Sequence, residues 1–394
     1  MSPKRALPSS AWASHTRPMF LVTAALLLQA GARPTQAELR RFDATLDSLR
    51  QQLDIPGLSA AIVYDDSVIW SRGYGFADVE RKIRATPHTP YEIASVSKPF
   101  AAVVLLRLAG AGKVSLDDPM SKWSSDYKTD SVHVRHVLTH TSEGVPGTAY
   151  NYNGNLYANL FDVVVKGSAR RYREILSNDI LVPLGMTETA PGNDLKPGQA
   201  NMEALLGKDV ATRYGMVALR DAAAYDVDSL GHVARAPEPD SGLSPASGII
   251  STVLDLAKFD AAIDNRVLLS DSLTTVMWTN ARAPDGHAFP YALGWFVQEY
   301  RGERLIWHNG NLIGRYSALY LKRPGARLTL LLLANSDALS MPFKLALGDV
   351  TQSAFACAFL AIAPVHQAPT PAPACAEESR ARIAAWRAAH RLAP

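Results

Sequence analysis

The stretch YEIASVSKPFAAVVLLRLAG, residues 91–110, decides the fold and the chemistry of this chain. A proline followed by an apolar, Ala- and Leu-rich run predicts a buried helix over residues 99–109, which a glycine then closes. Ser95 and Lys98 lie three residues apart just before this helix, so they share one face if the helix includes them. A helix N-terminus offers free N–H groups and positive potential, which favour a nucleophilic hydroxyl and an oxyanion. The spacing therefore indicates a serine nucleophile with a lysine base, although an N-cap Ser beside an exposed Lys produces the same pattern.

The segments around this stretch predict a sheet assembled from both ends of the chain. Glu38–Leu53 has the apolar spacing of an amphipathic helix, and Leu58–Tyr64 and Val68–Tyr74 are typical of a hairpin beside it. Residues 116–240 are rich in polar turns and lack strand alternation, which indicates a helical or irregular insertion. Four strand-like segments return late in the chain: Tyr291–Glu299, Leu305–His308, Tyr316–Leu321 and Leu328–Ala334.

Composition excludes several classes of protein. The 394 residues are 47% apolar, with 25 Gly and 25 Pro, which is typical of a globular chain of two domains or of one domain with an inserted part. Lys and Arg total 40 against 37 Asp and Glu, and a net charge of +3 is too small for a protein whose affinity rests on phosphate contacts. We therefore expect no nucleic-acid partner. Because no phosphate-binding loop or dinucleotide motif occurs, no cofactor is implied.

The N-terminus has the pattern of a secretory signal peptide. Residues 1–18 carry three basic and no acidic residues, an apolar run over 19–30 follows, and small residues then allow cleavage after Ala32 or Ala37. The apolar run is shorter than the roughly 20 residues that a membrane span needs. We expect residues 1–37 to be removed and the protein to be periplasmic or secreted, with no stable membrane span.

The two cysteines lie near the C-terminus, in the part that follows the expected domain (346–394). In an oxidising compartment Cys357 and Cys375 can form a disulfide across the Pro-rich stretch 364–373, and two unpaired thiols are the alternative. Residues 377–392 predict a short basic amphipathic helix that either docks on the body or contacts a membrane. The C-terminal part is therefore expected to consist of a helix, a linker and a tail.

Six segments, in order along the chain, form a pattern more specific than any one motif. They are IPGLSAAIVYDDSVIWSRGYGFADVE (55–80), YEIASVSKPFAAVVLLRLAGAGKVSLDDPM (91–120), VRHVLTHTSEGVPG (134–147), SPASGIISTVLDLAKF (244–259), YALGWFV (291–297) and WHNGNLIGRYSALYLKRPG (307–325). Together they resemble the beta-lactamase-related serine hydrolases of the penicillin-binding-protein type, which include class C beta-lactamases, D-alanyl-D-alanine carboxypeptidases and esterases. The resemblance implies an α/β fold of the α+β type within a domain over residues 38–345. Its antiparallel sheet, flanked by helices, would come from 38–115 and 241–345, and a mostly helical insertion would occupy 116–240.

The resemblance also implies roles for particular residues. Ser95 matches the acylated nucleophile and Lys98 its partner. The second family motif, a Tyr followed two residues later by Asn, best matches Tyr152, although Gly154 stands where the Asn is usual and Tyr150 is a competing match. A phenol beside Lys98 is expected to ionise more easily than its usual pKa of about 10 allows, and to pass a proton to the leaving group.

The third family motif, often Lys-Thr-Gly, stands here as His308-Asn309-Gly310. A histidine with an ordinary pKa of about 6.5 is mostly neutral at pH 7, so selection for a carboxylate-bearing beta-lactam is less expected than with a lysine. Gly310 lets the backbone approach the substrate, and Asn311 would supply the second oxyanion N–H beside that of Ser95.

A histidine triplet offers an alternative chemistry. His133, His136 and His140 have the spacing of metal ligands on one helix face. No carboxylate or cysteine completes the set, so we expect no metal site there.

Together these features predict an exported serine hydrolase that forms an acyl-enzyme at Ser95 and hydrolyses a small ester or amide. A D-amino-acid peptidase or D-Ala-D-Ala carboxypeptidase and a beta-lactamase are the alternatives, so the substrate is a small molecule or a peptide. The departures at Gly154 and His308 also leave open a catalytically weak scaffold on the same fold.

Overall fold

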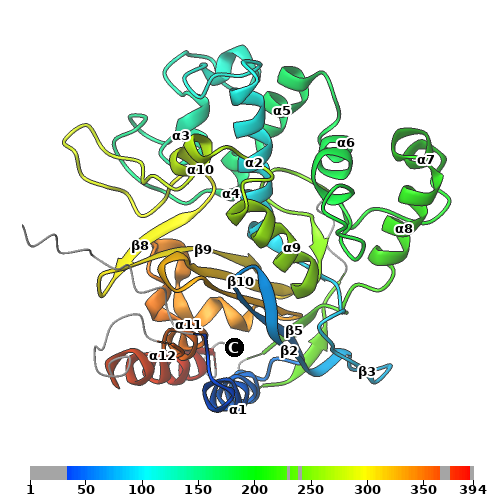
Figure 1. Ribbon diagram of the computed structural model, residues 1–394, viewed down its shortest axis with the longest axis vertical. Coiled ribbons are helices and arrows are strands. Elements are labelled where there is room, and N and C mark those ends of the chain that lie inside the picture. Colours follow the sequence, from blue (N-terminus) through cyan, green and yellow to red (C-terminus); the bar gives the residue numbers. More distant parts are fainter. Residues whose placement is uncertain (1–32, 229–230, 238–241, 364–372, 391–394) are drawn as a thin grey trace, which may run out of the picture.

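The computed structural model describes residues 33–228, 231–237, 242–363 and 373–390. The expected leader up to residue 32 and residues 364–372 of the expected linker lie outside these ranges. A seven-stranded antiparallel sheet forms the centre of the molecule, and helices cover both of its faces (Figure 1). The expected fold class, an α/β fold with an antiparallel sheet flanked by helices, is confirmed.

The sheet joins the two ends of the domain. Its strand order is β3-β2-β1-β11-β10-β9-β8, and Leu58 of the N-terminal hairpin lies opposite Ala334 of the last strand. The strands are β1 (Gly57–Tyr64), β2 (Ser67–Asp78), β3 (Ile83–Arg84), β8 (Phe296–Tyr300), β9 (Glu303–Leu312), β10 (Tyr316–Arg323) and β11 (Leu328–Ala334).

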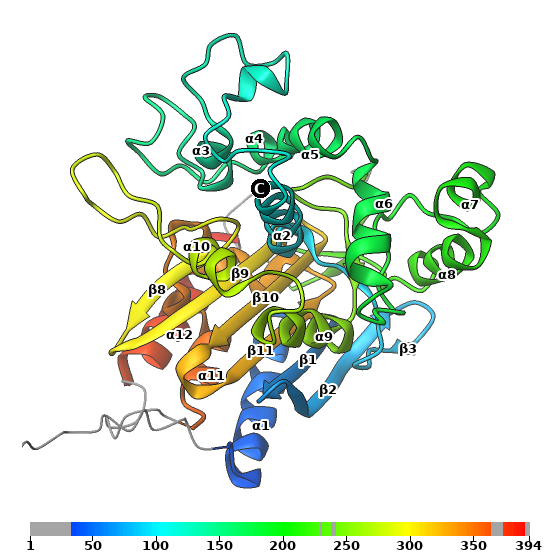
Figure 2. The same cartoon turned by 45° about the horizontal axis from the view of Figure 1, so that its top comes forward.

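Both faces of the sheet are buried, which explains the unbroken apolar sequence of β11. Leu330 and Leu332 pack into the core shared with α1, whereas Leu331 and Leu333 pack into the core shared with α2. Figures 1 and 2 show the two helical layers on opposite sides of the sheet. One layer contains α1 (Gln36–Gln52), α11 (Ala354–Leu360) and α12 (Pro373–His390), and the other contains α2 (Ser97–Gly110), α9 (Val253–Asp264) and α10 (Asp271–Met277).

The regular structure in the described part of the 116–240 segment is mainly helical, and turns and irregular stretches make up the larger share of its residues. Its six α-helices are α3 (Val134–Leu138), α4 (Gly154–Ala158), α5 (Leu160–Ser168), α6 (Tyr172–Leu176), α7 (Ala200–Leu206) and α8 (Lys208–Ala218). It ends in a two-stranded hairpin of β5 (Tyr225–Val227) and β6 (Val233–Arg235), which the polar sequence did not indicate.

The strand expected from Tyr291 begins only at Phe296. Residues 291–295 form a buried turn instead, because Gly294 adopts a left-handed φ of 78°. A Cβ at Gly294 would lie 2.6 Å from the Cβ of Ala102 in α2, so the glycine allows this turn to pack against α2.

The C-terminal helix α12 docks on the body of the protein. Ile383 is buried against the α1 and α11 core, and the Arg387 guanidinium forms an ion pair of 2.5 Å with Asp54. No helix among the described residues has the length and apolarity that a membrane span requires. Cys357 is disulfide-bonded, and because the side chain of Cys375 lies outside the described residues, the pairing of these two cysteines stays a prediction.

A buried ion pair attaches α9 to the sheet. Lys322 of β10 is completely buried and pairs with Asp260, which also accepts a hydrogen bond of 2.5 Å from the Tyr320 hydroxyl. The amine also lies 2.9 Å from Asp264. Although burial lowers the pKa of Lys322, the two carboxylates raise it overall, so the ammonium form persists.

Asp260→Asn should therefore destabilise the fold strongly, since it leaves the Lys322 ammonium buried without its main partner. We expect the free energy of unfolding to fall by about 3 kcal/mol, measured by urea denaturation. Asp271→Asn removes the exposed partner of Arg266 and is the matched control, for which we expect a much smaller loss. Equal losses of unfolding free energy in the two variants would contradict the stabilising role of the buried ion pair between Lys322 and Asp260.

Candidate active site

Ser95 lies on a strained turn in front of α2. It occupies the 3-10 turn η1 (Ala94–Val96), where Ala94 has a left-handed φ of 48°. The turn is anchored by the Ile93 N–H, which donates to the Ile249 carbonyl at 2.9 Å. Left-handed backbone at a residue other than glycine persists only where the surrounding structure enforces it. The fold therefore holds Ser95 in one position at the entrance of the helix.

Lys98 provides a base within reach of the Ser95 hydroxyl. Its Nζ lies 2.9 Å from Ser95 Oγ and donates to the Ala246 carbonyl at 3.2 Å. The side chain is completely buried in the first turn of α2. Burial lowers the pKa of Lys98 to about 7, because the ammonium form loses its hydration. A substantial fraction of Lys98 is therefore an uncharged amine near neutral pH.

Tyr152, rather than Tyr150, completes the group around Ser95. The Tyr152 hydroxyl hydrogen-bonds to Ser95, and its ring centroid lies 5.2 Å from Lys98 Nζ. The Tyr150 hydroxyl instead donates to the Ala346 carbonyl at 2.9 Å. The expectation of easier ionisation is wrong, because burial raises the pKa of Tyr152 and the hydrogen bond to Ser95 does not offset this. Tyr152 is thus a neutral phenol that can relay a proton.

Strand β9 brings the third motif against the nucleophile turn. β8 pairs with β9 only as far as Trp307, so the following residues have β10 alone as a partner strand. A Cβ at Gly310 would lie 2.4 Å from the Ile93 carbonyl oxygen and 3.2 Å from the Ala94 Cβ. Only glycine permits this approach. Asn311, the next residue of β9, is therefore adjacent to the point where Gly310 contacts the turn that carries Ser95.

Side chains of residues 340–341 form hydrogen bonds with this part of β9. The Ser340 hydroxyl donates to the Gly310 carbonyl at 2.9 Å, and the Asn311 amide donates to the sulfur of Met341 at 3.2 Å. Asn309 is nearly buried, and its carbonyl accepts from the His308 ring.

His308 is neutral in this environment. Its Nδ1 lies 2.7 Å from the Asn309 carbonyl oxygen, which can only accept, so Nδ1 carries the proton. Nε2 then accepts from the Tyr291 hydroxyl at 2.7 Å. Complete burial, together with the nearby Lys98 charge, holds the pKa of His308 well below its usual range. His308 therefore offers no positive charge to a substrate carboxylate at neutral pH.

Gly154 leaves space beside the lysine. A Cβ at this position would have only Lys98 Nζ within 4 Å, at an ordinary contact distance of 3.9 Å. Asn153 is the N-cap of α4, where its side chain accepts from the Leu156 N–H at 3.1 Å. A side chain can thus begin at position 154 without a clash at its Cβ.

Sequence reasoning missed the aromatic and histidine cluster behind the site. His140, considered only as a metal ligand, has its ring centroid 4.3 Å from that of Tyr152, and Tyr291 supports His308. His133 and His136 stack on each other instead, and the described residues contain no group of three or more side chains able to hold a metal ion. Both missed residues lie in the quoted segments, but nothing in their spacing indicated a contact.

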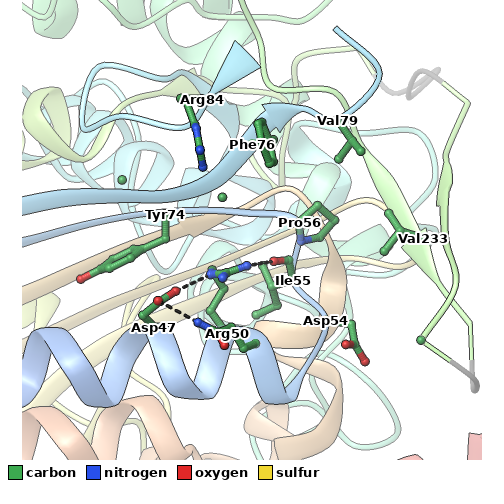
Figure 3. Close-up of a pocket in the computed structure, with 14 residues that line it drawn as sticks. Asp47, Arg50, Asp54, Ile55, Pro56, Tyr74, Phe76, Val79, Arg84 and Val233 are labelled. Carbon is green, nitrogen blue, oxygen red and sulfur yellow. Dashed lines mark hydrogen bonds and ion pairs between the residues drawn. The ribbon is translucent and has the colours of Figure 1, made fainter. Parts of the chain in front are cut away.

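A separate pocket lies between α1 and β2 (Figure 3). There Arg50 is held by Asp47 and by the Ile55 carbonyl. Ser95 and Lys98 do not line this pocket, so it is distinct from the candidate active site.

Comparisons with known proteins agree with this geometry. A protein-family model described as Beta-lactamase matches residues 42–350. Protein flp of Staphylococcus aureus is 25% identical over 350 residues, covering 79% of this chain and 66% of that protein. Penicillin-binding protein 4* of Bacillus subtilis is 24% identical over 318 residues, covering 68% and 66%. The chain thus spans 66% of the length of both relatives.

The fold has a close counterpart among solved structures. The octameric penicillin-binding protein homologue of Pyrococcus abyssi matches with a TM-score of 0.64 and 23% identity, covering 76% of this chain and 74% of that one. This likeness shows the fold.

The pKa of Lys98 predicts how the reactivity of Ser95 depends on pH. The rate of reaction with an alkyl fluorophosphonate should rise about tenfold per pH unit below about 7, because only the free amine accepts the Ser95 proton, and should level off above it. His308 stays neutral over this pH range, so its titration adds no second limb to the pH–rate profile. Mass spectrometry of the labelled protein measures the rate, and Ser95→Ala gives the background. A rate that falls as pH rises would contradict the role of Lys98.

Proposed function

The chain belongs to the beta-lactamase family, and we propose that it is an exported serine hydrolase that cleaves a small ester or amide through an acyl-enzyme on Ser95. The observation that carries this proposal is the contact of 2.9 Å between Lys98 Nζ and Ser95 Oγ. An amine with a pKa of about 7 can accept a hydroxyl proton near neutral pH, which an ordinary surface lysine cannot.

Acylation uses the groups gathered around Ser95. Its Oγ attacks the substrate carbonyl carbon while its proton passes to Lys98 Nζ. The N–H groups of Ser95 and Asn311 stabilise the negative oxygen of the tetrahedral intermediate, and each such donor contributes about 3 kcal/mol in well-studied enzymes. When the intermediate collapses, the bond to the leaving group breaks and Tyr152 relays the proton from Lys98 to that group. Lys98 is then a free amine again.

Deacylation repeats these steps with water as the nucleophile. Lys98 takes a proton from the water as its oxygen attacks the acyl carbon, and the same N–H groups bind the oxyanion. The ester bond to Ser95 then breaks, and the proton returns to Oγ. Tyr152 stays protonated between turnovers, in keeping with its raised pKa.

The electrostatics of the site support a neutral substrate. His308 is uncharged and its ring is occupied by Tyr291 and the Asn309 carbonyl, so it provides no cation for a carboxylate. Gly154 offers no side-chain amide to an acyl amide group. Both features favour small esters over carboxylate-bearing beta-lactams or peptides.

Hydrolysis of D-amino-acid peptides is the second candidate function. The resemblance to D-alanyl-D-alanine carboxypeptidases, together with a relative named a penicillin-binding protein, supports a cell-wall-type peptide as an alternative substrate. Release of D-Ala from a D-Ala-D-Ala peptide would establish it. A catalytically weak scaffold would show neither this release nor ester hydrolysis.

The cap of α1 bears on the position of the expected cleavage site. Thr35 caps α1 and forms a capping box with Glu38, a feature that contributes about 1 kcal/mol to a helix. Cleavage after Ala32 would keep this cap, whereas cleavage after Ala37 would cut inside α1. Of the two expected cleavage sites, we therefore favour the one after Ala32.

The first experiment is hydrolysis of p-nitrophenyl butyrate by the mature protein and by Ser95→Ala. We expect turnover by the mature protein and its loss in the variant, because only Ser95 can form the acyl-enzyme. Ser125→Ala, at an exposed position, is the matched control and should keep the full rate. Activity that survives in Ser95→Ala would show that the nucleophile is wrongly assigned.

The open space at Gly154 predicts a change in substrate preference. Gly154→Asn should fold and raise kcat/KM for D-alanyl amides relative to esters by about fivefold, the effect of one hydrogen bond of about 1 kcal/mol. Gly154→Ala adds only the Cβ and should leave this ratio unchanged. If both variants shift the ratio equally, the effect comes from the backbone and not from the amide.

A further inference from the structure

His140 is a buried histidine that takes no part in the proposed acylation and deacylation steps. His140 follows α3 and has a left-handed φ of 56°. Only 3% of the residue is exposed. Its ring lies among those of Tyr152, Tyr157 and Tyr291, with centroids 4.3, 5.2 and 4.8 Å away. A polar ring enclosed by aromatic side chains on a strained backbone needs a physical explanation.

His140 accepts hydrogen bonds from the two residues that flank Tyr152 in the sequence. The N–H of Asn151 donates to the His140 carbonyl at 2.9 Å, and the N–H of Asn153 donates to His140 Nδ1 at 3.1 Å. The residues immediately before and after Tyr152 are therefore bound by the same histidine. The strained φ of His140 allows its carbonyl and its ring to reach these two amides together.

The protonation state of His140 excludes a role as a base. Because Nδ1 accepts from Asn153, the neutral ring carries its proton on Nε2, which has no hydrogen-bond partner. Burial comes first, and the nearby basic groups of Lys98 and His308 add to it, so the pKa of His140 is held well below its usual range. The ring therefore has no free lone pair to offer to Ser95, and it acts through the segment that it binds.

We propose that His140 is a positioning residue that fixes Tyr152 against Ser95 and Lys98 by binding the backbone on both sides of it. This inference rests on the proposed function, in which Tyr152 relays the proton. The phenol must stay within hydrogen-bonding distance of the Ser95 hydroxyl, and a displacement of about 1 Å at such a group lowers turnover by up to about a hundredfold. The side-chain bond from Nδ1 to Asn153 is the part of this clamp that substitution can remove.

Two substitutions separate the acceptor from the ring. In His140→Asn, Oδ1 branches from Cγ as Nδ1 does, so it can accept from Asn153, and Asn tolerates a left-handed φ well. In His140→Phe the ring remains and the acceptor is lost. We expect kcat for p-nitrophenyl butyrate to stay within about threefold of the natural protein in His140→Asn and to fall by about ten- to a hundredfold in His140→Phe, with KM changed by less than about threefold.

A double substitution tests whether the effect passes through Tyr152. In a Tyr152→Phe background, His140→Phe should lower kcat by less than about threefold, because the hydroxyl that it positions is already absent. A merely structural role would lower kcat equally in both backgrounds and would overturn the proposal. Equal losses in His140→Asn and His140→Phe would overturn it too, since the ring rather than the acceptor would then matter.

Hydrogen exchange at the Asn153 amide provides a readout that does not depend on activity. The amide should stay protected in His140→Asn and exchange faster in His140→Phe. Faster exchange with an unchanged kcat would overturn the positioning role. If His140→Phe does not fold, His140→Gly also removes the acceptor, suits the left-handed φ, and should show the same loss of kcat. Failure of the proposed function is recognised separately, because the natural protein itself would then show no Ser95-dependent hydrolysis.

Discussion

The burial of the Lys98 amine beside Ser95 is the constraint on which the rest of the site depends. An ammonium ion removed from water is costly unless a carboxylate compensates it, and among the described residues none forms an ion pair with Lys98. Burial therefore favours the uncharged amine, and the pKa of Lys98 falls to about 7. Residues 97–106 of α2 are all buried, and without the packing that encloses them the amine would be hydrated and protonated. The chemistry of Ser95 is thus a consequence of how well α2 is covered.

Two glycines bring distant parts of the chain against the start of this helix. Gly294 allows the turn before β8 to contact α2, and a Cβ there would lie 3.1 Å from the Lys98 carbonyl oxygen. Gly310 allows β9 to contact the Ser95 turn. Because the β1–β2 hairpin and β11 pair across the whole domain, the sheet sets the position from which β9 makes this approach. The position of β9 against the Ser95 turn therefore depends on a sheet that neither end of the chain can form alone.

The parts of the fold and site that the sequence predicts are those encoded in local periodicity and in ordered motifs. The hairpin, α1, α2 and the late strands follow from apolar spacing, and Ser95, Lys98 and Tyr152 follow from the family motifs. The clamp of His140 on Asn153 and the bond between Tyr291 and His308 could not be predicted, because each joins segments that meet only in the folded protein. His140 also has the spacing of a metal ligand with His133 and His136, and only the left-handed turn after α3 separates it from them.

The three basic groups of the site form one electrostatic unit. Lys98 contributes to lowering the pKa of both His140 and His308, and His308 contributes to lowering that of His140. Protonation of any one of them therefore makes protonation of the others less favourable, and burial penalises the first charge already. A lysine at position 308 would add a permanent cation to this unit and would attract a substrate carboxylate to compensate it. The histidine, held neutral by burial and by the nearby Lys98, adds no permanent charge to the unit, so no such carboxylate is needed. The departure from the usual third motif is consequently compatible with an intact Ser95 and Lys98 pair, and it supports the proposed preference for neutral acyl groups.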